Sequence, residues 1–131
     1  MQSDIQVAGV PKWALWVGYL MSAVPVALLL MSGVMKLVKP DPIKEGFAHL
    51  GWDESLAFGL GIVEIACTVI YMIPSTAVLG AILLTGYLGG AIATHVRIGE
   101  PFVTQTILGL VVWGGLWLRD RRLRALLPLR S

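Results

Sequence analysis

Residues 55–73 read SLAFGLGIVEIACTVIYMI, an apolar run that carries one charged residue, Glu64, near its centre. At 1.5 Å of rise per residue, a helix of this length matches the roughly 30 Å hydrocarbon core of a bilayer. The run lacks the alternation of apolar and polar residues that is typical of a membrane β-strand. We therefore predict that residues 55–73 form a transmembrane helix.

Three further apolar segments surround this run, at residues 13–35, 76–96 and 102–118. The chain is 56% hydrophobic and only 14% charged, with a mean hydropathy of +0.79, whereas soluble domains carry about 25% charged residues. The sequence thus predicts an all-α integral membrane bundle of four transmembrane helices. At 131 residues, the chain forms this bundle as a single domain, residues 1–131.

The composition also limits the chemistry that the chain can perform alone. Ten Lys and Arg against eight Asp and Glu give a net charge of only +2, so we expect no nucleic acid as a partner. The shortage of charged residues indicates a lipid bilayer as the partner instead. The single cysteine, Cys67, cannot form a disulfide within the chain. Two histidines, of which only His95 lies in a predicted span, indicate no metal site and no haem ligated by two histidines of one protomer.

The only long connection, residues 38–54, begins with a Pro-Asp-Pro sequence that ends the first helix. Ile43, Phe47 and Leu50 then recur at helical spacing, which predicts a short helix lying in the membrane interface. Asp53 is placed to cap the second span.

Basic residues predict the orientation in the membrane. The two tails hold six of them, and the opposite side holds four, so both termini are expected in the cytoplasm and the protein in the cell (inner) membrane. The tail residues are Lys12, Arg119, Arg121, Arg122, Arg124 and Arg130, and the others are Lys36, Lys39, Lys44 and Arg97.

Glu64 is the most informative residue of the chain, because a charge at the bilayer midplane costs about 2.5 kcal/mol or more. At helical spacing its face also carries Gly61, Thr68 and Tyr71. Lys36, at the end of the first span, reaches Glu64 only if its side chain points inward, so we expect Glu64 to be protonated and to donate a hydrogen bond. A purely structural role, as an ion pair that fixes helix register, is the alternative.

His95 closes the third span and can exchange protons near neutral pH. We predict Glu64 and His95 as catalytic groups. The predicted ligand-binding residues are Lys36, Glu64, Tyr71, Tyr87, His95 and Arg97. Gly86 and Gly90 form a GxxxG pair, which we expect to pack against another helix of the same chain rather than a second subunit.

Four stretches, in this order and spacing, give the chain a resemblance to a known family: SGVMKL (32–37), HLGW (49–52), GIVE (61–64) and GGAIATHVRIG (89–99). Together they resemble the DoxX-like family of small four-helix membrane proteins, over almost the whole chain. The resemblance implies a four-helix membrane bundle in which Lys36, Glu64 and His95 are the family's polar positions. It also implies a link to quinone-dependent oxidation, to complexes that handle oxidative stress or to receptor chaperoning, roles that one scaffold can host.

Three functional hypotheses follow. The first is a redox-associated subunit that binds a quinone or another apolar ligand near Glu64, with a redox partner protein to carry electrons. The second is a non-enzymatic assembly or chaperone subunit of a membrane complex, and the third is a small proton-coupled transporter. A homodimer is expected in each case.

Overall fold

The computed structural model describes residues 10–128, and within this range the chain is entirely helical, without a β-strand. The elements are α2 (Lys12–Val38), α3 (Asp41–Leu50), α4 (Leu56–Met72), the 3-10 turn η1 (Pro74–Thr76), α5 (Ala77–Arg97), α6 (Val103–Arg119) and α7 (Arg121–Leu126). The predicted all-α class is confirmed. Arg130, one of the basic residues used to predict orientation, lies outside the described residues.

Each of the four predicted apolar segments is a helix whose ends lie within three residues of the predicted ones. Two continuous helical stretches, Lys12–Val38 and Pro74–Arg97, are long and apolar enough to cross a membrane. The helix α4 is apolar but shorter, at 17 residues. By length and composition, the described residues therefore contain two candidate membrane spans.

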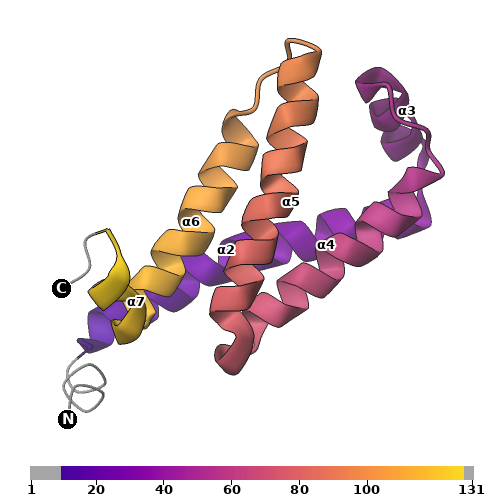
Figure 1. Ribbon diagram of the computed structural model, residues 1–131. Helices are drawn as coiled ribbons and strands as arrows, with labels where there is room; N and C mark the ends of the chain where they lie inside the picture. The colour runs from indigo at the N-terminus through magenta and orange to yellow at the C-terminus, as the bar shows by residue number, and fades with distance from the viewer. Residues whose placement is uncertain (1–9, 129–131) are drawn as a thin grey trace.

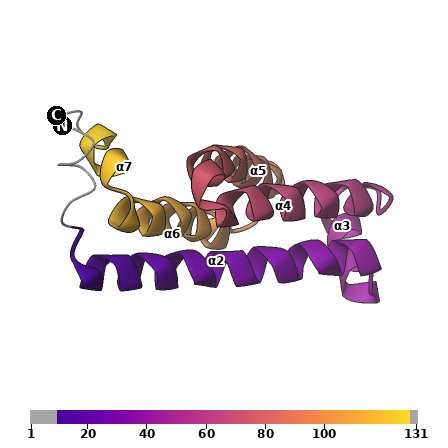
Figure 2. The same ribbon diagram turned by 90° about the horizontal axis from the view of Figure 1, so that it is seen from below.

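The four long helices form two layers (Figures 1 and 2). In Figure 2, α2 makes one layer, and α4, α5 and α6 all lie on one side of it and make the other layer. Near the ends of the chain α6 lies against α2, whereas α4 and α5 meet at their η1 connection and diverge from it toward the side where α3 lies (Figure 1). This divergence leaves space between the two helices at the α3 end.

Small residues allow the close approach of α6 to α2 and of α5 to α4. A Cβ on Gly115 would lie 2.6 Å from Ser22 Oγ and 2.9 Å from the Gly18 carbonyl oxygen, so α6 rests directly on α2. Similarly, a Cβ on Gly80 would lie 2.3 Å from the backbone nitrogen of Tyr71. These contacts are the type that small residues permit between membrane helices.

The predicted packing of Gly86 and Gly90 against another helix of the same chain is wrong. A Cβ added to Gly86, Gly89 or Gly90 would meet no atom within 4 Å. The reason is that this part of α5 has already diverged from α4, so the glycines face open space instead of a neighbouring helix.

The connection between α2 and α4 contains the predicted short helix, α3, whose Phe47 is buried. Asp53 does not cap α4: its Oδ1 accepts a hydrogen bond from the backbone N–H of Ser55 at 3.0 Å, and Ser55 itself holds the cap position. That N–H lowers the pKa of the Asp53 carboxyl.

Candidate functional site

A cavity of about 560 Å³ lies in the space between the diverging helices. Five helices and the α3–α4 connection contribute to its wall, which is mostly apolar. The lining residues are Leu28, Leu29, Ser32, Lys36, Phe47, Leu50, Trp52, Leu56, Leu60, Glu64, Gly86, Tyr87, Leu88, Gly90, Ala91, Thr94, His95, Thr104, Gln105 and Leu108. A concave, apolar site with a few polar groups is the usual form of a small-molecule site.

The first polar group of the cavity is centred on Glu64, whose side chain is 1% exposed. Its Oε1 accepts from Lys36 Nζ at 2.8 Å, from Tyr87 Oη at 2.9 Å and from Ser32 Oγ at 3.3 Å. Lys36 Nζ also donates to Ser32 Oγ at 2.7 Å. Glu64 belongs to α4, and the donors to its Oε1 come from α2 and α5. Three helices therefore meet at this single carboxylate oxygen.

This geometry corrects the expectation that Glu64 is protonated and acts as a donor. Lys36 does point inward from α2, although the sequence placed it near the membrane edge. The Lys36 ammonium group lies 2.8 Å from Glu64 Oε1, and this contact is a salt bridge. The resting site holds an ion pair rather than an isolated carboxylic acid.

The second polar group is centred on His95 of α5. Its Nδ1 lies 2.7 Å from the Ala91 carbonyl oxygen, which can only accept, so Nδ1 carries the proton. In the neutral ring Nε2 is then an acceptor, and the Gln105 amide nitrogen lies 3.4 Å from it. This arrangement turns Gln105 Oε1 away from the ring, where it is buried without a partner.

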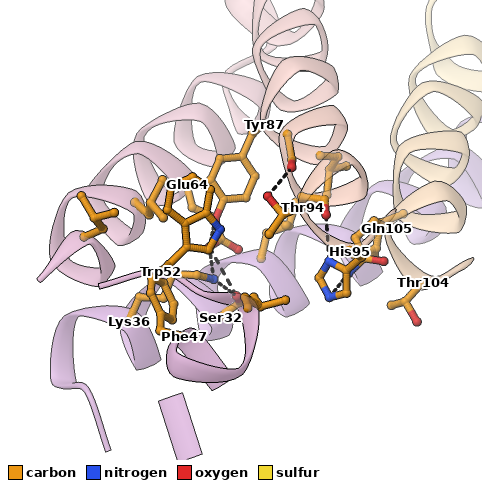
Figure 3. Close-up of a pocket in the computed structure, with 18 of the residues that line it drawn as sticks. Ser32, Lys36, Phe47, Trp52, Glu64, Tyr87, Thr94, His95, Thr104 and Gln105 are labelled. Carbon is orange, nitrogen blue, oxygen red and sulfur yellow. Dashed lines mark hydrogen bonds and ion pairs between the residues drawn. The ribbon is translucent and has the colours of Figure 1, made fainter. Parts of the chain in front are cut away.

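Figure 3 shows that the two polar groups lie apart, on different walls of the same cavity. Lys36, Ser32, Glu64 and Tyr87 are together on one side, and His95 and Gln105 are on the other. The first group offers a cation, a carboxylate and a phenol. The second offers a ring nitrogen and an amide.

Two of the predicted ligand-binding residues do not line this cavity. Tyr71 is buried in the last turn of α4, where its hydroxyl donates to the Val112 carbonyl oxygen at 2.6 Å and lies 2.9 Å from Ser22 Oγ. Arg97 lies at the α3 end, where it donates to the Leu50 carbonyl oxygen and stacks over Trp52 at 5.6 Å. Lys36, Glu64, Tyr87 and His95 are brought together around the cavity.

The α3 end of the cavity is held by contacts between α3 and the end of α5. Besides the Arg97 contacts, His49 Nε2 lies 2.6 Å from Glu100 Oε1 on the surface. Phe47 and Trp52 both line the cavity beneath this connection. The α3 segment therefore forms the wall at this end.

Sequence reasoning did not assign Ser32, Trp52 or Gln105 to the site. Gln105 had a usable signal, because an amide inside an apolar span is rare enough to suggest a functional position. Ser32 lies one helical turn before Lys36, which also favours contact between the two. Among the described residues, no group of three or more His, Cys, Asp or Glu side chains could hold a metal ion.

Most of the chain is similar to one known protein family. The model of the DoxX-like family matches residues 20–118. The chain belongs to the DoxX-like family. No curated protein and no solved structure matches it. Every residue that lines the cavity falls inside the DoxX-like segment, so the site belongs to the part of the chain that defines the family.

Proposed function

We propose that this DoxX-like protein is a membrane subunit that binds a quinone or its quinol in the cavity between α4 and α5. The observation that carries the proposal is the pair of separate polar groups on the walls of one apolar cavity. A quinone is a flat apolar ring with oxygen atoms on opposite edges. The Lys36 ammonium has a third hydrogen that it can donate to one oxygen, and the His95–Gln105 pair can contact the other.

The side chains also fit the proton chemistry of quinones. Reduction of a quinone to a quinol takes up two electrons and two protons, and oxidation releases them. Glu64, as a carboxylate, and His95, through Nε2, are suited to accept the protons that quinol oxidation releases on the two sides of the ring, and to return them in the reverse reaction. The electrons come from or go to a redox partner protein, which carries a flavin, haem or iron–sulfur centre.

The same proposal includes the arrangement in the membrane. We place α2, α4, α5 and α6 across the bilayer, with both termini in the cytoplasm of a cell (inner) membrane. The 17-residue helices α4 and α6 are at the short end of the range for spanning helices. The Lys36–Glu64 pair supports this placement, because charges inside a membrane bundle face its interior and pair with each other.

An assembly subunit is the second candidate, and the completeness of the ion pair favours it. Glu64 and Lys36 already have partners within the chain, so the pair could serve only to fix α2 against α4. In that case the protein would stabilise a partner complex and bind no quinone.

Tryptophan fluorescence distinguishes the two candidates, because Trp52 lines the cavity and quinones quench indole emission. The purified protein, in mild detergent, is titrated with a benzoquinone that bears a decyl chain. The proposal predicts saturable quenching that Trp52→Phe removes. Trp13→Phe is the matched control, because Trp13 is exposed at the start of α2, far from the cavity-lining end that carries Lys36. This variant should keep the saturable phase of quenching. Non-saturable quenching that is equal in all three proteins would favour the assembly subunit.

A further inference from the structure

The cavity is partly open, and its exposed lining residues on α4 and α5 have a composition suited to a hydrocarbon chain. Leu56 and Leu60 of α4 line the cavity and are also 45% and 36% exposed, so the cavity is open beside them. On α5, Gly86 and Gly90 also line the cavity. Both glycines are exposed, and neither presents a side chain to the space in front of it.

The opening is continuous with the polar end of the cavity. Glu64 lies one helical turn beyond Leu60 on α4, and Tyr87 follows Gly86 directly on α5. A ligand whose head group contacts Glu64 and Tyr87 can therefore place its remaining atoms against these leucines and glycines. Since α4 and α5 diverge along their length (Figure 1), the path leads out between them, at the depth of the apolar helix segments.

We propose that Gly86 and Gly90 form a lateral passage for the long apolar tail of the ligand. This inference rests on the proposed function and narrows the ligand class to lipid-soluble quinones that carry a chain, rather than small water-soluble quinones. A side chain on either glycine would occupy the space that the tail needs. The absence of side chains thus has a binding role here, whereas Gly18 and Gly115 serve helix packing.

The chain offers a matched control for this inference. Gly86, Gly89 and Gly90 lie on the same helix, and each has open space where a Cβ would be placed. Gly89 does not line the cavity, whereas the other two do. Leucine is also a better helix former than glycine, so all three Gly→Leu variants are expected to fold.

The test compares two ligands in detergent micelles: a benzoquinone without a side chain and the same ring bearing a decyl tail. Gly86→Leu and Gly90→Leu should each weaken binding of the tailed ligand about tenfold and change binding of the tailless ring less than twofold. Gly89→Leu should leave both dissociation constants unchanged. Gly86→Ala, a smaller substitution, should give a smaller loss in the same direction.

Each other outcome overturns the inference in a recognisable way. Equal loss of both ligands in Gly86→Leu would place the glycine at the head group instead of the tail. Unchanged binding together with an altered oligomeric mass in native mass spectrometry would make the glycine face a contact between copies of the chain. Failure of the unmodified protein to bind either ring would contradict the proposed function itself, and with it the passage.

Discussion

Glu64 and Lys36 allow a quantitative test of the ion pair. The structure predicts that Glu64→Gln and Lys36→Met each destabilise the protein, and that the double variant is more stable than the sum of the two losses implies. Glu64→Gln retains an oxygen that can accept from Ser32 and Tyr87, but it leaves the Lys36 ammonium without a counter-charge. Lys36→Met leaves a carboxylate that is 1% exposed.

The expected magnitudes follow from burial. Loss of one partner from a buried pair costs about 3–5 kcal/mol, and Lys36→Met should fall in this range because Glu64 is almost completely enclosed. Lys36 is 16% exposed and retains its bond to Ser32, so Glu64→Gln should cost only about 2 kcal/mol. The double variant removes both charges, and a coupling free energy of about 2 kcal/mol or more is expected.

The assay is a double-mutant cycle on the free energy of unfolding, measured by reversible denaturation in mixed micelles. Glu54→Gln and Lys44→Met form the control cycle, because both residues are exposed in the connecting segments, and their coupling should be about zero. A coupling below about 0.5 kcal/mol for the Glu64 and Lys36 cycle would refute the ion pair. It would restore the prediction, made from sequence, of a protonated Glu64.

Three shorter predictions concern packing and the polar groups. Gly80→Ala should destabilise the protein by about 3 kcal/mol, because the new Cβ would meet the Tyr71 backbone. Gly89→Ala, where the Cβ meets open space, should instead stabilise the protein by about 0.5–1 kcal/mol. Thermal unfolding of the two variants measures both effects. Tyr87→Phe removes a hydroxyl that lies 2.9 Å from Glu64 Oε1 and should lower the free energy of unfolding by about 1 kcal/mol; an unchanged value would exclude that hydrogen bond. Gln105→Leu removes an unpaired buried acceptor, so it should weaken binding of the quinol, which carries donors, more than that of the quinone; equal changes in both dissociation constants would contradict this.

The helices could be predicted from the sequence because the lipid solvent imposes strong constraints on length and hydropathy. Residues 13–35 and 55–73 lie close to α2 and α4, and the spacing of Ile43, Phe47 and Leu50 was sufficient to find α3. Helix length, hydropathy and residue spacing do not predict the angles at which the helices cross. This is why the Gly86 and Gly90 pair was assigned to packing, when the divergence of α5 from α4 leaves both glycines open.

The candidate site was found in part, for reasons that differ between residues. Glu64 and His95 were identified because polar groups in apolar spans are costly. The contact of Lys36 with Glu64 depends on the rotamer of the long Lys36 side chain. The sequence gives the position of Lys36 along its helix, but this position does not determine the rotamer. Tyr71 shares a helix face with Glu64, but it lies two turns away and bonds to Ser22 and Val112 at the other end of the bundle.

Photoaffinity labelling tests the central claim, that the cavity binds a quinone, most directly. The purified protein is irradiated with an azido-benzoquinone bearing a decyl tail, and labelled residues are mapped by mass spectrometry. The proposed function predicts labels on residues 28–36 of α2 and 86–95 of α5, which an excess of unlabelled quinone prevents. Labels confined to other surfaces, or labels in the cavity that unlabelled quinone does not reduce, would contradict it.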